Sequence, residues 1–510
     1  MPNNEWGDFQ TPADLAGQVL GSLGATRWTR LLEPTCGLGR FLEASQALGS
    51  DVHRIGIEIQ SGHAAAASRF ADTVLEANLF DLNLSNGLEW PDDGPLLIVG
   101  NPPWVTNSQL GLLGSVNVPA KSNVRRLRGL DAMTGASNFD IAEHITLKLM
   151  AEMHAEEPTI ALLVKTQVAR NVLSYAEQFS MPYSGFTIRM IDAKLWFGAS
   201  VDACLFTAEH SSVPEYTCDV FASIGAESPS HRIGVLDGRL VADIDKYKAS
   251  SFVDGASPVE WRSGVKHDAA QVMEITDSER DALGLESDYV FPLCKCSDLF
   301  HGRRPTRHMV IPQRSFGERT EHLRLDAPKL WAYLQAHAGV LDSRASSIYN
   351  KQPRFAVFGL GDYTFAPYKI AISGLHKQIR FVLLGPFEGK PIVVDDASYV
   401  LGFDDGHHAA MCHAILTSPA VSGLLDSLVF WDAKRPINKK LLQRIDLLAV
   451  ADTSAPDLLD ACAARAAAVL GLSAPQSWQS VLDQLRSSWS QSSTEAALQF
   501  AEASVVAAST

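Results

Sequence analysis

Four consecutive residues, Asn101-Pro102-Pro103-Trp104, combine the groups needed to hold a flat ring that carries an amino group. Two successive prolines remove backbone N–H donors and restrict the chain to an extended turn. The Asn101 side-chain oxygen and the Pro102 carbonyl can then accept both hydrogens of one exocyclic amino group. The Trp104 indole offers a face on which the ring can stack. The tetrapeptide therefore predicts a site that binds an amino group on a planar ring.

An apolar run directly before the tetrapeptide, residues 96–100, predicts the strand that positions it. Its continuous Leu-Leu-Ile-Val sequence is typical of a parallel strand that is buried on both faces. Ligands of such α/β sheets bind beyond the carboxyl ends of the strands. We therefore expect Asn101 to lie at the ligand-binding edge of a sheet.

A second element of this kind lies upstream, where an apolar strand at residues 31–33 leads through Gly37-Leu38-Gly39 into a helix. This order is typical of the first turn of a nucleotide-binding α/β sheet. The glycines allow the backbone to approach a ligand closely. Because the full dinucleotide fingerprint is absent, the turn alone does not identify the ligand.

Two further strands bring polar residues to the same edge. Residues 54–59 form a strand with Glu58 near its end, about 25 residues after the first strand, where such folds place a ribose-binding carboxylate. The third strand, residues 73–78, leads to Phe80, whose ring can cover the adenine of a nucleotide cofactor. Either Asn78 or Asp81 can receive the adenine amino group, and spacing does not choose between them.

These motifs resemble, in content and in order, the γ class of adenine-N6 DNA methyltransferases, which use S-adenosylmethionine. The resemblance covers residues 7–209 and begins with the Phe9-Gln10-Thr11-Pro12 segment. One departure is that the usual Asp-Phe pair at the adenine-binding position reads Asn78-Leu79-Phe80 here. The resemblance implies cofactor contacts from Thr11, Pro12, Glu33, Pro34, Cys36, Gly37, Gly39, Glu58, Ile59, Asn78, Phe80 and Asp81.

The same resemblance implies how the target base is held. A base inside a duplex cannot reach a buried cofactor, so we expect it to rotate out of the stack. The catalytic tetrapeptide, Asn101, Pro102, Pro103 and Trp104, would grip its amino group without a covalent nucleophile. By position, Phe197 matches the family residue that stacks on the other face of the base, so Trp104 and Phe197 would sandwich an adenine.

The predicted fold class is α/β: a Rossmann-like, seven-stranded methyltransferase sheet with a C-terminal β-rich α+β target-recognition domain and a helical tail. The 510 residues are enough for two or three domains. We place the cofactor-binding catalytic domain at residues 1–212, the DNA target-recognition domain at 230–452 and the helical segment at 453–510. Short β-like runs separated by turn residues indicate the domain at 230–452. Ala- and Leu-rich segments indicate helices at 453–510.

The formal charge of −15 argues mildly against a nucleic-acid partner, but the cations are unevenly distributed. Three runs are locally basic and contain no acid, which favours a cleft for duplex DNA. The runs contain Lys121, Arg125, Arg126 and Arg128; Arg303, Arg304 and Arg307, continuing to Arg314; and Lys434 and Arg435, continuing to Arg444.

The composition indicates where the protein is located and whether it binds a metal. Seven scattered cysteines in a chain of this length do not form a disulfide framework, so we expect a reducing, cytoplasmic location. No apolar stretch approaches the ~20 residues of a membrane span. Cys294-Lys295-Cys296 and Cys412-His413 lack the spacing of zinc ligands, and we expect no metal. The sequence does not decide whether a separate restriction or defence subunit is a partner.

Other functions fit parts of the pattern. Asn-Pro-Pro-aromatic also serves enzymes that methylate cytosine N4, guanine N2 in RNA, or glutamine in proteins; the long C-terminal region favours DNA, and Asn101 favours adenine. Glu388-Gly389-Lys390, with Asp362 upstream, resembles the end of a nuclease triplet, so a bifunctional restriction enzyme is an alternative. A non-catalytic DNA-recognition subunit is another, although such a subunit has no physical reason to keep an intact tetrapeptide.

Overall fold

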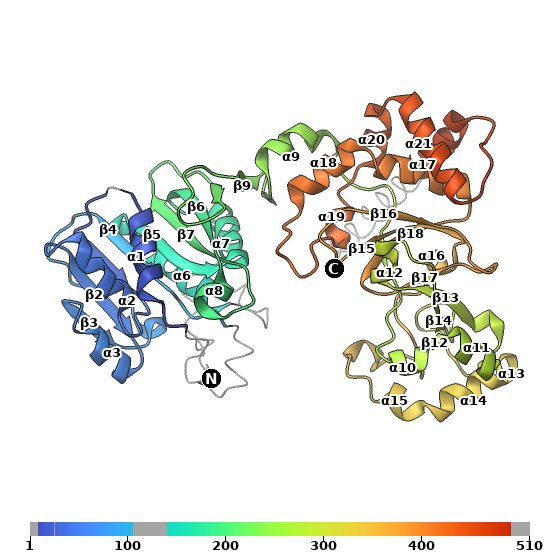
Figure 1. Cartoon of the computed structure of the whole chain (residues 1–510), viewed down its shortest axis with the longest axis horizontal. Helices are drawn as coiled ribbons and strands as arrows, with labels where there is room; N and C mark the ends of the chain where they lie inside the picture. Colours follow the sequence, from blue (N-terminus) through green and yellow to red (C-terminus); the bar gives the residue numbers. More distant parts are fainter. Residues whose placement is uncertain (1–8, 25, 106–139, 491–510) are drawn as a thin grey trace, which may run out of the picture. The chain divides into compact units, whose positions relative to one another are not determined.

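The computed structural model describes residues 9–24, 26–105 and 140–490, which fall into two compact units, Met1–Asp245 and Lys246–Thr510 (Figure 1). The division lies beyond residue 212, where the sequence predicted that the catalytic domain ends. The reason is that three more strands follow that residue and pair with the first sheet.

The first unit is built on a ten-stranded sheet in the order β10-β9-β8-β6-β7-β5-β4-β1-β2-β3. The run from β6 to β3 is the predicted seven-stranded sheet, and β8, β9 and β10 extend it at one edge. The strands are β1 Arg30–Glu33, β2 His53–Glu58, β3 Thr73–Glu76, β4 Leu96–Gly100, β5 Thr159–Lys165, β6 Tyr183–Ile191, β7 Ala203–His210, β8 Thr217–Phe221, β9 His231–Leu236 and β10 Arg239–Val241.

Strand direction decides which loops share an edge. Strands β1 to β5 pair in parallel. Strand β7 is antiparallel to both β5 and β6, so β6 runs in the same direction as β5 and β4. The carboxyl ends of β1 to β6 therefore meet at one edge of the sheet, where the predicted site residues follow β1, β2, β3 and β4.

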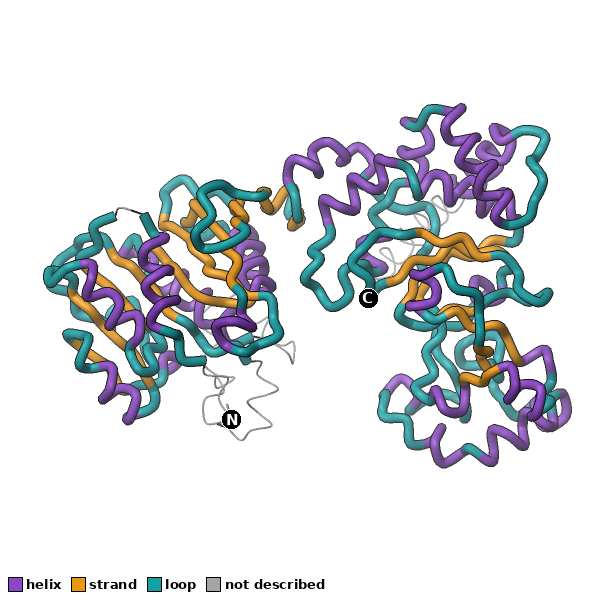
Figure 2. Tube along the Cα trace, in the orientation of Figure 1, coloured by secondary structure: helices purple, strands orange, loops and turns teal. Residues whose placement is uncertain are grey.

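Both faces of this sheet are covered by helices, which explains why the middle residues of its central strands are apolar (Figure 2). Every residue of β1 and β4 is buried. Leu31, Leu97 and Val99 pack in one cluster with Leu15 and Val19 of the first helix. The helices are α1 Ala13–Ser22, α2 Arg40–Ala44, α3 Ser61–Ala67, α6 Ile141–Glu152, α7 Thr166–Gln178 and α8 Ala193–Phe197.

The second unit contains two four-stranded sheets, in the orders β11-β18-β15-β16 and β12-β14-β13-β17. The predicted combination of sheets and helices is confirmed, although the helices of this unit contain more residues than its short strands. The strands are β11 Arg262–Ser263, β12 Glu274–Thr276, β13 Val290–Cys294, β14 Arg307–Val310, β15 Tyr368–Ser373, β16 Phe381–Leu384, β17 Val393–Val394 and β18 Ser398–Phe403.

Helices complete the second unit. Toward its C-terminal end, α21 packs along α17, and residues 478–490 are also helical. No helix among the described residues is long and apolar enough to cross a bilayer. The helices are α9 Ile244–Ser250, α10 Ala270–Met273, α11 Asp277–Leu283, α12 Cys296–His301, α13 Leu323–Asp326, α14 Pro328–Ala336, α15 Ala338–Asp342, α16 Asp362–Phe365, α17 Gly406–Leu416, α18 Pro419–Leu428, α19 Lys439–Leu442, α20 Leu447–Thr453 and α21 Pro456–Val469.

The turn between β1 and α2 depends on Gly39. Its φ is +78°, a left-handed conformation, and a Cβ there would lie 2.9 Å from the Ala67 Cα atom. Backbone at that distance cannot give way as a flexible side chain can, so both the conformation and the space require glycine.

We therefore expect Gly39→Ala to lower the free energy of unfolding by about 1–3 kcal/mol. Urea denaturation followed by circular dichroism measures the loss. The matched control is Gly17→Ala, which lies inside α1 with no atom within 4 Å of the new Cβ. That change should be neutral or slightly stabilising. Equal stability of the two variants would contradict this account of the turn.

Candidate functional site

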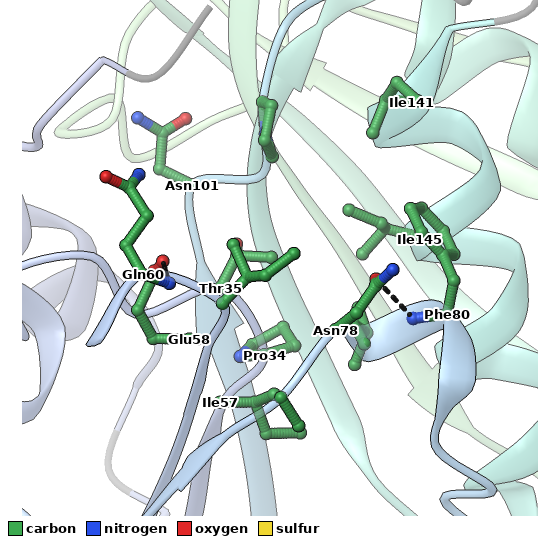
Figure 3. Close-up of a pocket in the computed structure, with 14 residues that line it drawn as sticks. Pro34, Thr35, Ile57, Glu58, Gln60, Asn78, Phe80, Asn101, Ile141 and Ile145 are labelled. Atoms are coloured by element: carbon green, nitrogen blue, oxygen red, sulfur yellow. Dashed lines mark hydrogen bonds between the residues drawn. The ribbon is translucent and has the colours of Figure 1, made fainter. Parts of the chain in front are cut away.

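A pocket opens at the carboxyl edge of the first sheet, between the loops that follow β1, β2, β3 and β4 and the start of α6 (Figure 3). Its empty volume, including the opening to solvent, is about 640 Å³. The lining residues are Pro34, Thr35, Ile57, Glu58, Ile59, Gln60, Ala77, Asn78, Leu79, Phe80, Asn101, Pro103, Ile141 and Ile145. The pocket thus unites residues that lie on five separate segments of the chain.

Glu58 is the acidic residue of this pocket. Its side chain is buried, and it accepts hydrogen bonds from the backbone N–H groups of Gly37 and Gln60, each at 2.8 Å. One bond reaches each carboxylate oxygen, so each oxygen keeps acceptor capacity for a further donor. The bond to Gly37 also ties β2 to the glycine turn after β1, so the carboxylate is held in place before any ligand binds.

The glycine turn lies behind the pocket instead of lining it. Buried Glu33 accepts a hydrogen bond from the Leu42 N–H at 3.1 Å, and its burial raises its pKa well above the usual value. Burial likewise raises the pKa of the Cys36 thiol. These residues, with Gly37 and Gly39, shape the turn and leave Pro34 and Thr35 to face the cavity.

The structure separates the two residues that spacing could not. Asn78 lines the pocket, and its Oδ1 accepts a hydrogen bond from the Phe80 N–H at 3.1 Å. Asp81 is exposed and does not line the pocket. The Phe80 ring also lines the cavity and meets His144 edge-on, with ring centroids 5.1 Å apart. Burial lowers the His144 pKa to about 4, so this ring is neutral at physiological pH.

Asn101 lies at the upper left of the pocket as drawn in Figure 3. Its Nδ2 donates to the Phe9 carbonyl at 2.8 Å, and its buried Oδ1 has no hydrogen-bond partner among the described residues. The buried hydroxyl of Thr35 also lacks such a partner. A buried acceptor without a donor is costly, and two of them in one pocket indicate a polar ligand.

The rest of the tetrapeptide anchors this arrangement. Pro102 is buried, and Pro103 lines the pocket. The buried Trp104 donates its indole N–H to the Leu163 carbonyl at 3.0 Å, which joins the turn after β4 to β5. The indole is therefore fixed by a hydrogen bond in addition to packing.

An aromatic cluster closes the space beside Asn101. The Trp104 and Phe197 rings meet edge-on at 5.1 Å, and Phe9 lies 5.6 Å from Trp104 and 5.7 Å from Phe197. The predicted sandwich requires parallel rings separated by a base. In the structure the two rings contact each other, so a base can enter between them only if Phe197 moves.

The N-terminal segment reaches the site through residues that the sequence did not single out. Thr11 is buried and Pro12 is the N-cap residue of α1, but neither lines the pocket. The contacts come from the Phe9 carbonyl and from Gln10, whose Oε1 accepts from the Leu38 N–H at 3.1 Å. The Phe-x-Thr-Pro motif was the available signal, but it could not show that the residues before the Thr-Pro pair make these contacts.

Two of the three basic runs lie in the second unit, and the cations at the start of each run face solvent, whereas Arg444 at the end of one run is half-buried and pairs with Asp254. Arg303 is 61% exposed, 3.3 Å from Asp298, and Arg307 is 50% exposed, 4.0 Å from Glu274. Arg304, Lys434 and Arg435 are also exposed. The first run, Lys121, Arg125, Arg126 and Arg128, lies outside the described residues.

The residues that resemble a nuclease triplet have structural partners. Glu388 pairs with Arg280 at 2.9 Å, and the Lys390 ammonium donates to the carbonyls of Ser287 and Val290. Over residues 9–24, 26–105 and 140–490, no group of three or more His, Cys, Asp or Glu side chains is arranged to hold a metal ion.

No family model matches the chain. Over 467 residues, however, it is 38% identical to the type II methyltransferase M.NspV of Nostoc sp. (strain ATCC 29411 / PCC 7524), a match that covers 87% of this chain and 96% of that protein. A shorter match, 31% identical over 104 residues, is to the type II methyltransferase M.CvrRI of Paramecium bursaria Chlorella virus XZ-6E. It covers 20% of this chain and 26% of the viral protein.

Among solved structures, the type IIL restriction-modification enzyme MmeI, determined in complex with DNA, resembles this chain with a TM-score of 0.50. The match covers 94% of this chain and 75% of MmeI at 13% sequence identity. At that identity the likeness shows a shared fold and says nothing about individual side chains.

A buried glutamate near the pocket should make the stability of the fold depend on pH. Glu143 on α6 accepts a hydrogen bond from Asn171 at 2.8 Å, and burial raises its pKa to about 7. Because the folded state holds the proton more tightly than the unfolded chain, this group stabilises the fold fully at low pH. Its contribution is lost as the pH rises from the unfolded pKa near 4.5 to about 7.

Glu143→Gln should remove that loss, which amounts to up to roughly 3 kcal/mol. Urea unfolding at pH values on either side of this window measures it. The variant should gain stability relative to wild type as the pH rises, whereas a control at the exposed Glu89 (Glu89→Gln) should not. A difference between variant and wild type that stays constant with pH would contradict the assignment.

Proposed function

Since this chain belongs to the type II methyltransferases and uses S-adenosylmethionine as its methyl donor, we propose that it methylates duplex DNA at the exocyclic N6 amino group of an adenine. Its first unit has the class I methyltransferase fold that the sequence predicted. The proposal concerns the acceptor: which polymer, which base and which atom.

The observation that carries the proposal is the state of Asn101. Its amide nitrogen donates to the Phe9 carbonyl, and its oxygen faces the pocket with no donor among the residues that the structure describes. An amino group on a planar ring supplies that donor, and the Pro102 carbonyl offers a second acceptor. Accepting both hydrogens favours a tetrahedral nitrogen and frees its lone pair to attack the methyl group.

The pocket beside Asn101 has the groups that the methyl donor needs. Glu58 has acceptor capacity for two ribose hydroxyls, Asn78 and Phe80 suit an adenine ring, and the Thr35 hydroxyl lacks a partner among the described residues. S-adenosylmethionine supplies an electrophilic methyl group when bound. The chain's own part is to hold the acceptor nitrogen next to that pocket, so positioning carries the rate.

The target base reaches this site only if it leaves the duplex, because Asn101 lies at a buried turn. Trp104 is fixed by its bond to Leu163, whereas Phe197 lies at the end of a five-residue helix that stops at Gly198. We infer that Phe197 moves away from Trp104 and that the base takes the place of that contact.

The DNA itself is proposed to bind along exposed cations, among them Arg303, Arg304, Arg307, Lys434 and Arg435. The relatives are named as type II methyltransferases, and MmeI was determined bound to DNA, which supports a DNA substrate. Chromosomal DNA as the substrate would place the enzyme in the cytoplasm. A separate restriction chain would supply cleavage in such a system.

Asn101→Ala should reduce methyl transfer to duplex DNA by about a hundred- to a thousandfold, because it removes an acceptor that acts on the reacting nitrogen. Binding of S-adenosylmethionine, measured by calorimetry, should stay within a few-fold of wild type. Transfer of labelled methyl to unmethylated DNA gives the rate. A variant that transfers at near the wild-type rate would refute the role of Asn101.

Glu58→Gln should weaken cofactor binding while leaving the transfer step itself largely intact. The neutral amide replaces one carboxylate acceptor by a donor, so cofactor affinity should fall by about ten- to a hundredfold, equal to the loss of one charged hydrogen bond. At saturating cofactor, much of the transfer rate should return. Unchanged affinity in Glu58→Gln would remove Glu58 from the cofactor site.

A further inference from the structure

Leu195 is the third residue of α8, and 72% of its surface is exposed. A single exposed leucine is common on protein surfaces and needs no explanation by itself. The position of Leu195 in the fold is what matters. Helix α8 follows β6, which runs in the same direction as β4 and β5. Leu195 and Asn101 therefore stand at the same edge of the sheet.

Hydrogen bonds close both ends of the short helix that carries Leu195. Asp192 caps it by accepting the Leu195 N–H at 2.9 Å, and Gly198 closes it with a bond to the Lys194 carbonyl at 3.0 Å. The buried Ala193 packs this helix against the core of the first unit. These bonds set the backbone position of Leu195, and its side chain is exposed to solvent.

The same helix carries the aromatic residue of the target site. Phe197 contacts Trp104 at 5.1 Å and packs on the core. Two residues along a helix are about 200° apart, so a helix that packs the half-buried Phe197 against the core presents Leu195 on the opposite face, toward solvent. One element thus contributes a ring to the base pocket and an apolar side chain to the surface outside it.

An extruded base leaves a gap in the stack, and unfilled apolar surface inside a duplex opposes extrusion. Proteins that distort DNA insert apolar wedges such as leucine between base steps. We propose that Leu195 enters the duplex at the position that the target base vacates. The inference rests on the proposed function, and its partner is the same duplex DNA. The exposed side chain of Lys194, next in sequence, can then meet a phosphate.

The test compares Leu195→Ala with wild type on two duplexes that carry the mapped recognition site. In one duplex the target base is paired; in the other an abasic nucleotide stands opposite it, so that the base is already unpaired. On the paired duplex the variant should lose about tenfold in kcat/KM, because extrusion costs a few kcal/mol. On the unpaired duplex most of that loss should disappear.

Leu195→Met keeps an apolar side chain of similar volume and should retain most of the rate on the paired duplex. The matched control is Val213→Ala, because Val213 is 78% exposed in the loop after β7. Since β7 is antiparallel to β5, that loop lies at the opposite edge of the same sheet. This variant should behave as wild type on both duplexes.

Three results would overturn the inference. An unchanged rate for Leu195→Ala on the paired duplex would show that no wedge acts there. An equal loss on both duplexes, or weaker binding of S-adenosylmethionine, would assign Leu195 to support of the fold or the cofactor. If wild type transferred no methyl group to either duplex, the proposed function would fail and the inference with it, a result distinct from the first two.

Discussion

The hydrogen bond from Asn101 Nδ2 to the Phe9 carbonyl decides what the site can do. A side-chain amide can present either its donor or its acceptor to a ligand, and this bond commits the donor to the protein. The oxygen is then left buried, facing the pocket, without a partner among the described residues. An acceptor in that state is costly until a hydrogen-bond donor arrives, and in our proposal that donor is an amino group. The hydrogen bond from the Trp104 indole to the Leu163 carbonyl holds this turn against β5.

The sheet brings the other half of the reaction to the same place. Parallel strands end together, so the turns after β1, β2 and β3 supply one pocket whose wall continues to the turn after β4. Glu58 connects two of these turns through its bonds to Gly37 and Gln60. The bonds that hold these turns together therefore also shape the pocket that we propose for the cofactor.

Sequence reasoning reached Asn101, Glu58 and the parallel sheet because each depends on a local pattern: a polar residue directly after an apolar strand. It did not reach the Phe9 contact, since that bond joins residues 92 positions apart and uses a backbone carbonyl. Spacing left Asn78 and Asp81 equivalent, and only the three-dimensional path of the turn separates them. The strands beyond residue 212 were missed as parts of this sheet because edge pairing is set by long-range contacts.

The central claim is that the buried oxygen of Asn101 accepts the amino group of an adenine. The most direct test is to label duplex DNA with the wild-type enzyme and radioactive S-adenosylmethionine, digest it to nucleosides and identify the labelled product. The account predicts that the label appears as N6-methyladenine. Label in N4-methylcytosine would keep the amino-group chemistry but contradict the choice of base, and label on a ring carbon would contradict the account as a whole.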